Sequence, residues 1–417
     1  MNVMQSSKNF LGINSLGRIG KLMVWNQLIS RDFDGIVVNL GRNVGKTPED
    51  IISTLESDST YGRLENFLYG HSGKKVNFKL VDSNNLVLEV DGMPIKILTQ
   101  ERNPKNIPWA KEGVQIVVDC SGQFLDPTAS VDDTRGSLRG HIAGGAKKVV
   151  ASAPFKIKDA SKKMPDDSLM MVYGVNHMDF DPLKHHVVSA ASCTTTGLAH
   201  MIKPLLENEL TSNILTASMS TVHAATNTQS ILDTVPKSGA TDLRKTRSVF
   251  NNIILSTTGA AKALDSILPQ IQEIGFMADS VRIPTNTVSL ITLNLTFYSG
   301  IDEKGNPLIN REAINNIYKD AAKGPQRDML VFSKKQNVSS DLIGYRAAAV
   351  IEGHETHTRT GFIKLPVDSL AKYGVQANSE INIPVTHLKL FGWYDNEYGS
   401  YVNFLTRLVN HINASLR

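Results

Sequence analysis

The chain has 417 residues, of which 41% are hydrophobic and 20% are charged, and its formal net charge is +4. This composition excludes a disordered, fibrous or membrane-embedded protein, and the length predicts two domains, because one core seldom organises more than about 300 residues. The charge is small and its Lys and Arg residues are scattered, so we expect no primary nucleic-acid partner.

The cysteine content points to a reducing compartment. Cys120 and Cys193 are the two cysteines, too few for a secreted disulfide framework, so at least one can be a working thiol. Met1 to Asn9 carries neither a signal-peptide core nor an Arg-rich amphipathic pattern, and no later stretch is apolar for long enough to span a membrane. We expect a cytoplasmic protein without a membrane partner.

The first half of the chain reads as strands alternating with helices or loops, which favours a Rossmann-type doubly wound parallel sheet. We expect this dinucleotide-binding domain to span residues 1–191 and to be completed by a C-terminal helix within 398–417, its apolar spacing clearest at 401–412. The strands expected here are 10–14, 36–39, 115–119 and 148–151.

The second half predicts an α+β catalytic domain over residues 192–397. Its strand-like runs are partly alternating, which is typical of a mostly antiparallel sheet with helices on one face. Charged or turn-rich segments at 156–167 and 352–360 are expected to be surface insertions. The elements expected are a helix at 198–206 and strands at 214–222, 281–295 and 382–390.

A glycine-containing turn follows the first strand. Gly12 to Gly20 has the place of a Rossmann phosphate turn, where backbone amides at a helix start approach a pyrophosphate, although Ser15 stands at one expected glycine. Twenty residues after Gly20, Leu40 replaces the carboxylate that binds the ribose of NAD, and Arg42 could pair with a 2′-phosphate. The cofactor is NAD or NADP, with a slight preference for NADP.

Cys193 and His223 are the candidate reacting groups. Cys193 stands between a strand-like run and a helix, where free amides and the helix dipole lower a thiol pKa. His223 ends an apolar strand and could take a proton from the thiol. Taken alone, a buried Cys or a lone His is more often structural. A Cys and a His that can act together as nucleophile and base favour a catalytic role for both. No metal is expected.

Three further segments could bind anions. Thr226 lies just after the histidine, Thr258 and Gly259 open a predicted helix, and Arg282 precedes a proline. Threonine hydroxyls with helix-start amides suit one phosphate, and an arginine with a threonine suits another. Each is also an ordinary helix cap or surface arginine when considered alone.

Taken together, these segments resemble the glyceraldehyde-3-phosphate dehydrogenase family over nearly the whole chain. The departures are Ser15 for a glycine, Leu40 for an acidic residue and Thr196 for an asparagine. The segments that carry the resemblance are Gly17–Gly20, Asp58–Gly62, Gln100–Arg102, Gly144–Lys147, Ala191–Thr195, Thr258–Lys262 and Trp393–Glu397.

The resemblance implies a phosphorylating aldehyde dehydrogenase with Cys193 as nucleophile and His223 as base. It further implies a homotetramer acting on glyceraldehyde 3-phosphate and inorganic phosphate. Alternatives are an erythrose-4-phosphate dehydrogenase-type activity and a nucleotide-binding moonlighting protein on the same scaffold. The implied contacts are Arg18, Ile19, Arg102 and Ser152 to the dinucleotide, Asn396 to the nicotinamide, Ser192, Thr194, Thr258 and Gly259 to inorganic phosphate, and Thr226 and Arg282 to the substrate phosphate.

Overall fold

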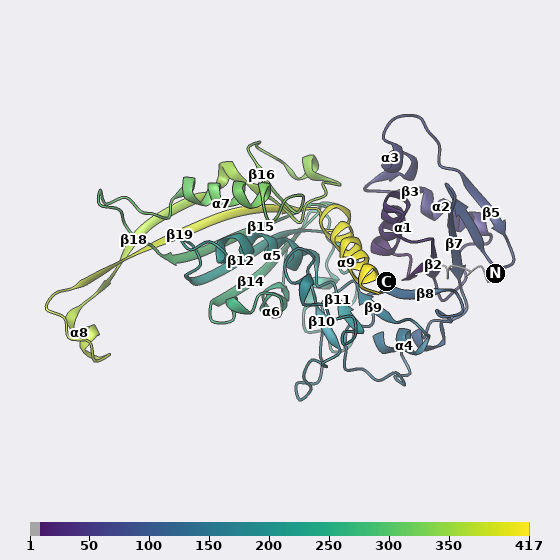
Figure 1. Cartoon of the computed structure of the whole chain (residues 1–417), viewed down its shortest axis with the longest axis horizontal. Helices are drawn as coiled ribbons and strands as arrows, with labels where there is room; N and C mark the ends of the chain where they lie inside the picture. The colour runs from purple at the N-terminus through teal and green to yellow at the C-terminus, as the bar shows by residue number, and fades with distance from the viewer. Residues whose placement is uncertain (1–8, 417) are drawn as a thin grey trace, which may run out of the picture. The chain divides into compact units, whose positions relative to one another are not determined.

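The computed structural model describes residues 9–416. The N-terminal segment Met1 to Asn9, which the sequence analysis considered as a signal peptide, therefore lies outside the described residues except for Asn9. The chain divides into two compact units (Figure 1). The first unit comprises the residues up to Ser192 together with the C-terminal residues from Glu397 onward. The second unit comprises Cys193–Asn396. Among residues 9–416 no helix combines the length and apolar character needed to cross a bilayer.

The first unit is built on a nine-stranded sheet in the order β10-β11-β9-β8-β1-β2-β7-β6-β5. From β10 to β7 the neighbours pair in parallel, whereas β7, β6 and β5 are antiparallel. The strands are β1 (Phe10–Asn14), β2 (Gly35–Asn39), β5 (Phe78–Asp82), β6 (Val87–Val90), β7 (Met93–Leu98), β8 (Val114–Asp119), β9 (Lys148–Ala151), β10 (Ser168–Met170) and β11 (Val187–Ser189), with a separate pair of β3 (Ser57–Asp58) and β4 (Gly62–Arg63).

The order reverses at β1, because the chain runs from β1 to β2 on one side and later places β8 on the other. In such sheets ligands bind beyond the carboxyl ends of the strands at this switch point. The doubly wound fold predicted from the strand and helix pattern is therefore confirmed. The helices of this unit are α1 (Arg18–Ser30), α2 (Pro48–Glu56), α3 (Leu64–Tyr69), α4 (Leu138–Ala143) and α9 (Asn403–Ser415).

The turn between β1 and α1 is strained at Ser15, whose φ is +86°. A side chain in this left-handed region costs on the order of 1 kcal/mol that glycine would not incur. Gly20 permits the helix to pack on the turn, because a Cβ there would lie 2.0 Å from the carbonyl oxygen of Ser15. The turn thus keeps the shape of a phosphate loop although one of its glycines is missing.

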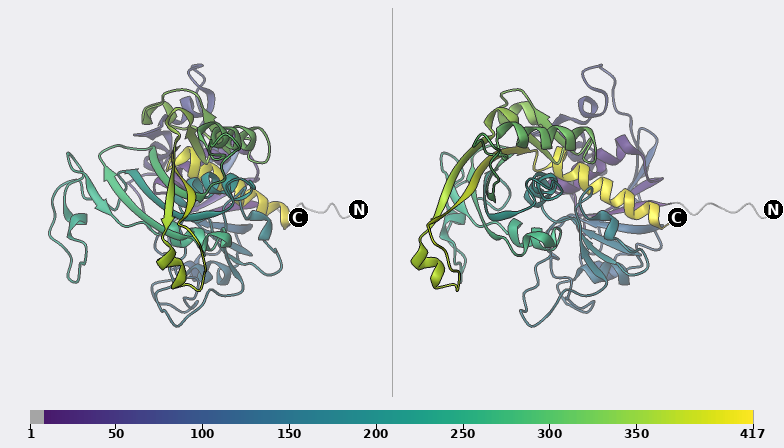
Figure 2. Two further views of the ribbon diagram at one scale, coloured as in Figure 1. Left: turned by 90° about the vertical axis from the view of Figure 1, so that its left-hand side faces the viewer. Right: turned by 60° about the vertical axis from the view of Figure 1, so that its left-hand side comes forward.

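The C-terminal helix α9 belongs to the core of the first unit. Its apolar side chains Leu405, Leu408, Val409 and Ile412 are buried in one cluster with residues of α1 and β1. It is preceded by a π-helical turn, Tyr398–Val402, so the regular helix predicted at 401–412 begins two residues later. The yellow helix in Figures 1 and 2 is this segment.

The second unit contains a mixed sheet in the order β13-β14-β12-β15-β19-β17-β16, with β18 paired to β19. Two pairs, β12 with β14 and β16 with β17, are parallel, and the remaining pairs are antiparallel. The strands are β12 (Ile214–Ala224), β13 (Ile254–Ser256), β14 (Gly275–Ile283), β15 (Ser289–Tyr298), β16 (Leu330–Ser333), β17 (Ala349–Glu352), β18 (His357–Leu365) and β19 (Ile381–Tyr394).

The long helix α5 (Cys193–Leu206) lies against β17 and β19. Gly392 of β19 allows this close packing, because a Cβ there would lie 2.3 Å from the sulfur of Met201. The helix starts five residues before the predicted 198–206, since the run Cys193–Thr196 is helical as well. The other helices are α6 (Ala260–Asp265), α7 (Arg311–Lys323) and α8 (Val367–Ala371).

Two sequence predictions for this unit are wrong. The single strand expected at 281–295 is two strands, β14 and β15, separated at Pro284, which lacks a backbone donor for the sheet. The segment 352–360 is not a surface insertion as a whole, because Glu352 and Thr356 are buried, although His354 and Glu355 are exposed. The alternating Thr358 and Thr360 lie in β18, which forms a long hairpin with β19.

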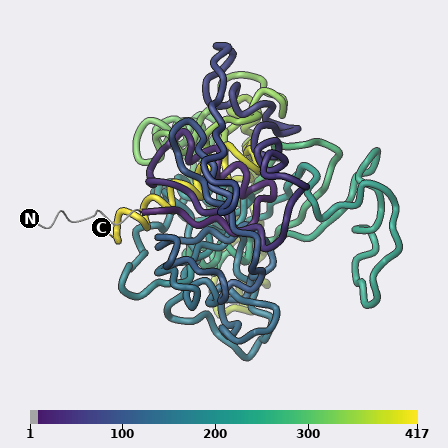
Figure 3. Tube along the Cα trace, turned by 90° about the vertical axis from the view of Figure 1, so that its right-hand side faces the viewer, coloured from purple at the N-terminus to yellow at the C-terminus, as the bar shows by residue number. Residues whose placement is uncertain are grey.

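That hairpin, β18 and β19, extends away from its sheet and has α8 at its tip, as the views of Figures 1 and 2 agree. The loop between β12 and β13, residues 225–253, also extends from the body of the unit and is drawn in teal in Figures 2 and 3. Both segments add length to the second unit without lengthening its core.

Candidate active site

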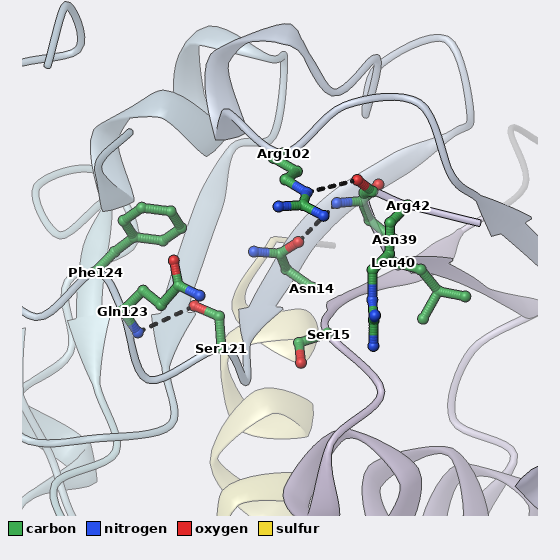
Figure 4. Close-up of a pocket in the computed structure, with 10 residues that line it drawn as sticks. Asn14, Ser15, Asn39, Leu40, Arg42, Arg102, Ser121, Gln123 and Phe124 are labelled. Carbon is green, nitrogen blue, oxygen red and sulfur yellow. Dashed lines mark hydrogen bonds between the residues drawn. The ribbon is translucent and has the colours of Figure 1, made fainter. Parts of the chain in front are cut away.

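A pocket of about 420 Å³ lies in the first unit at the switch point of its sheet. Its walls come from residues that end or follow β1, β2, β7 and β8, and Figure 4 shows them arranged around one space. Backbone amides at the start of α1 lie beside the same turn, which suits a pyrophosphate. The lining residues are Asn14, Ser15, Asn39, Leu40, Gly41, Arg42, Arg102, Ser121, Gln123 and Phe124.

A row of hydrogen-bonded, buried side chains, two amides and one carboxylate, lies beneath this pocket. Asn39 Nδ2 donates to Asn14 Oδ1 at 2.8 Å, and Asn14 Nδ2 donates to Asp119 Oδ2 at 2.7 Å. Burial alone would raise the pKa of Asp119, but hydrogen bonds from His141, Ser121 and Asn14 outweigh it and lower the pKa. Asp119 is thus a buried anion that fixes the orientation of the lining amides; the sequence analysis missed it.

Leu40 and Arg42 also line a second pocket of about 290 Å³, with Ser15 and Gly17. The Arg42 side chain is exposed and has no ion pair among residues 9–416. Arg102 Nε donates to the carbonyl oxygen of Gly41 at 3.1 Å, which supports the loop that carries Arg42 (Figure 4). The structure therefore brings together three of the residues predicted for the cofactor.

The other predicted cofactor residues lie elsewhere in the first unit. The Arg18 guanidinium pairs with Asp58 and Glu397, and its backbone amide lies at the start of α1. Ile19 packs on the core of this unit. Ser152 does not line the 420 Å³ pocket, and its amide donates to the carbonyl oxygen of Asp119 at 2.9 Å.

Cys193 and His223 meet in the second unit. Cys193 is the first residue of α5, and its Sγ lies 3.6 Å from Nε2 of His223 in β12. Residue 282 of β14 is the register partner of His223 in the parallel pair of strands, which places the guanidinium of Arg282 beside the ring. The sheet register thus assembles a thiol, an imidazole and a cation.

The imidazole is neutral in this setting. Burial is the main cause that lowers the pKa of His223, the charge of Arg282 lowers it further, and the result is about 3. Nδ1 lies 2.8 Å from the carbonyl oxygen of Ala224 and 2.6 Å from Arg282 Nη1. These two contacts require opposite tautomers; with the proton on Nδ1 and bonded to Ala224, Nε2 offers its lone pair to the thiol.

The thiol differs from the sequence-based expectation. Burial raises the pKa of Cys193 above its ordinary value, although Arg282 and the hydroxyl and amide of Thr194 act in the opposite direction. The predicted lowering at a helix start is therefore outweighed by the loss of solvent. Both pKa shifts favour a neutral thiol beside a neutral imidazole over a thiolate–imidazolium pair.

Tyr394 is a buried neighbour that the sequence analysis did not single out. Its Oη lies 2.8 Å from Oγ1 of Thr194 and 2.8 Å from Oγ1 of Thr221, and its ring meets His223 edge to face. Thr194, expected to bind phosphate, thus shares its hydroxyl with Tyr394. Asn396, two residues on, is buried and accepts a 3.0 Å bond from Ser289 Oγ.

The remaining anion candidates occupy separate places, Thr226, Thr258 and Gly259 in the second unit and Ser192 in the first. The Thr226 hydroxyl contacts Thr228 and Gln229 rather than Arg282. Thr258 Oγ1 accepts the amide of Ala260 at 3.2 Å at the start of α6, next to Gly259. Ser192 precedes the nucleophile at the end of the first unit. Within residues 9–416 no group of three or more His, Cys, Asp or Glu side chains could hold a metal ion.

The doubly wound sheet with its switch-point pocket and the cysteine–histidine pair define an NAD(P)-dependent oxidoreductase built from an α/β unit and a second unit with a mixed sheet. Residues 10–127 match the NAD binding domain of glyceraldehyde 3-phosphate dehydrogenase, and residues 192–367 match its C-terminal domain. The chain belongs to the glyceraldehyde-3-phosphate dehydrogenase family.

Curated relatives agree over almost the entire chain. A glyceraldehyde-3-phosphate dehydrogenase of Streptomyces coelicolor is 33% identical over 408 residues, covering 97% of this chain and 99% of that protein. Proteins of the same name from Geobacillus stearothermophilus and Sclerotinia sclerotiorum are 33% and 32% identical, covering 93% and 97% of this chain and 94% and 97% of their own length.

Proposed function

We propose that this protein is a phosphorylating glyceraldehyde-3-phosphate dehydrogenase. It oxidises the aldehyde through a thioester on Cys193 and transfers the acyl group to inorganic phosphate. The observation that carries the proposal is the 3.6 Å approach of Cys193 Sγ to His223 Nε2 at the first residue of a buried helix. Family membership makes the substrate an aldehyde phosphate.

His223 moves the protons of the reaction. It relays the thiol proton as Sγ bonds to the aldehyde carbon, so that the carbonyl oxygen becomes a hydroxyl. It then takes that hydroxyl proton while the carbon loses its hydride and becomes a thioester. When a phosphate oxygen attacks the thioester, the carbon–sulfur bond breaks, Cys193 leaves as thiolate, and an acyl phosphate is released.

The dinucleotide, when bound, supplies the acceptor for the hydride. Its adenosine half fits the 420 Å³ pocket, whose anchored amides and arginines match a polar ligand. We propose that the amides of Arg18 and Ile19 hold the pyrophosphate, that Arg102 lines the adenosine site and that Asn396 holds the nicotinamide amide. Ser152 lies outside the pocket lining, so its contact is proposed from the family resemblance alone.

We further propose that NADP is used at least as well as NAD. Leu40 offers neither the hydrogen bonds to the ribose nor the repulsion of a 2′-phosphate that a carboxylate would provide. Arg42 lines the same pocket without an ion pair among residues 9–416. A planar guanidinium suits a phosphate well.

Arg282 and Thr226 are proposed for the substrate phosphate, and Ser192, Thr194, Thr258 and Gly259 for inorganic phosphate. Support for Arg282 comes from its partly buried guanidinium, whose Nε has no hydrogen-bond partner among the described residues. A buried unsatisfied donor is costly, and an anion would satisfy it.

A homotetramer is also proposed. Large apolar side chains are exposed on the loop 225–253 and on the neighbouring strands, and exposed apolar patches usually mark interfaces. Light scattering at several protein concentrations would test self-association. The residues concerned are Ile231, Leu232, Val235, Leu243, Phe250, Ile253, Leu255 and Met277.

The activity is tested by initial rates with glyceraldehyde 3-phosphate, with and without phosphate or arsenate, and with NAD and NADP in parallel. We expect turnover that requires an acyl acceptor. Cys193→Ser should abolish turnover while the protein keeps its fold and dinucleotide binding, because the packing volume is nearly unchanged. Undiminished turnover in that variant would exclude the thioester route.

A further inference from the structure

The second unit contains a pocket of about 250 Å³ that the proposed reaction does not use. Its floor is the face of β15 and β19 that carries Leu290, Phe391 and Trp393, where Leu290 and Trp393 are register partners. Tyr394 is the next residue of β19, so it points to the opposite face. The rest of the lining is Gln336, Asn337, Glu352 and Glu355.

The wall of this pocket includes Glu352, a buried carboxylate without a counter-ion. Glu352 is 4% exposed and ends β17. Its Oε2 accepts from Asn337 Nδ2 at 2.8 Å and from Trp393 Nε1 at 3.0 Å. Its Oε1 has no hydrogen-bond partner, and Glu352 has no ion pair among residues 9–416.

An uncompensated buried carboxylate is costly, and two neutral donors on one oxygen compensate the charge only in part. Lys389, on the same face of β19, lies over the ring of Phe391 at 5.4 Å and does not pair with Glu352. A cation in the pocket beside Glu352 would offset the charge of this carboxylate. The ring of Trp393, whose Nε1 donates to the acid, adds a surface that attracts cations.

The chemistry favours an organic cation over a metal ion. Residues 9–416 offer no group of three acidic, histidine or cysteine side chains there, and Ca²⁺ or Mg²⁺ needs several oxygen ligands. A guanidinium can give two parallel hydrogen bonds to a carboxylate and stack on aromatic rings. We propose that this pocket binds a guanidinium group, with Glu352 as its counter-ion and the ring of Trp393 as its stacking surface.

The guanidinium can come from a small molecule or from an arginine side chain of a second copy of the chain. The loop 225–253 carries the exposed Arg244 and Arg247, each in an ion pair with an aspartate of the same loop, so a second copy would have to exchange that partner for Glu352. The inference does not rest on the proposed function, because none of the lining residues belongs to the proposed reaction.

The first arm of the test titrates the full chain with ethylguanidinium and follows tryptophan fluorescence. Trp25 and Trp109 are fully buried in the first unit, whereas Trp393 lies in the pocket wall. We expect a saturable change that is absent in Trp393→Phe and absent with ethylurea, a neutral molecule of similar shape. The comparison of ethylguanidinium with ethylurea uses the unmodified protein, so it tests the role of charge without a substitution of Glu352.

Glu352→Gln should weaken ethylguanidinium binding about tenfold or more, because the charge is lost while the oxygen that accepts from Asn337 and Trp393 is retained. Glu355→Gln is the matched control at an exposed acid of the same pocket, and it should change the affinity less than about threefold. Equal binding of ethylguanidinium and ethylurea, or unchanged binding in Glu352→Gln, would overturn the proposal.

The second arm separates the two sources of the group. If a second copy supplies it, Glu352→Gln should lower the association measured by sedimentation velocity, and ethylguanidinium should compete with that association. If a small molecule supplies it, association should be the same in both proteins while the fluorescence titration saturates. The absence of both responses would refute the site.

Discussion

Arg282 and His223 are register partners on the parallel strands β14 and β12, and Arg282 Nη1 lies 2.6 Å from Nδ1 of the imidazole. A fixed cation therefore stands behind the ring whose other nitrogen faces the thiol. Its charge lowers the pKa of both neighbours, adding to burial at His223 and opposing burial at Cys193.

Arg282→Leu removes that charge, so we expect the pKa values of both Cys193 and His223 to rise. The pH profile of iodoacetamide alkylation at Cys193 should move to higher pH, whereas Arg282→Lys, which keeps a positive charge, should move it less. The Michaelis constant for the aldehyde phosphate should also rise about tenfold or more, through the loss of a charge-assisted contact. An unphosphorylated aldehyde is the control substrate. If the Michaelis constants for the two aldehydes rise equally in Arg282→Leu, Arg282 has a structural role.

His223 should show no ordinary titration near neutrality. With its pKa lowered to about 3, chiefly by burial, the ring is unprotonated from about pH 4 upward, so its function as a base is lost only below that range. We expect no inflection near pH 6.5 in kcat/KM, and His223→Asn should lower kcat by about 10²–10⁴. An inflection near pH 6.5 that disappears in His223→Asn would contradict this assignment.

Leu40→Asp should shift the ratio of specificity constants toward NAD, because the new carboxylate can bind the ribose and repel a 2′-phosphate. Arg42→Ala should weaken NADP selectively by about 1–3 kcal/mol, the value of a hydrogen bond to a charged group. Dissociation constants for both dinucleotides, measured by titration, check the two changes. Arg31→Ala serves as the control, because Arg31 donates to the Asp91 carbonyl oxygen and does not line the pocket. If the unmodified protein uses NAD exclusively and Arg42→Ala changes the dissociation constant of neither dinucleotide, Arg42 has no role in cofactor binding.

Ala191 carries a strained backbone two residues before the nucleophile, with φ at +53°. Its amide donates to Ser189 Oγ and its carbonyl accepts from Tyr401 Oη, each at 3.0 Å. Tyr401→Phe should therefore slow Cys193 alkylation and lower kcat several-fold, since one of the two bonds that hold this conformation is lost.

Ala191→Gly should restore much of that loss in the double variant, because glycine adopts a positive φ without strain. The four proteins of this cycle are compared by single-turnover rates and by thermal unfolding. Loss of stability with unchanged alkylation would show that Tyr401 only supports the fold.

Much of the site was readable because it depends on local pattern. The alternation of short apolar strands with helices predicted the doubly wound sheet, and the turn near Gly17 lies where the structure places the switch-point pocket. Cys193 stood out because it lies between a strand-like run and a helix, and His223 because it ends an apolar strand. Their assigned roles stay predictions for kinetics to decide.

Other features depend on distant partners and were decided only by the tertiary structure. No local signal shows that the Arg18 side chain pairs with Glu397, nearly four hundred residues later, or that Tyr394 lies between Thr194 and Thr221. The sign of the Cys193 pKa shift depends on how far folding removes water from the thiol, which a helix-start pattern does not report. The pairing of His223 with Arg282 depends on strand register, because a slip of one residue would turn the arginine to the other face of the sheet.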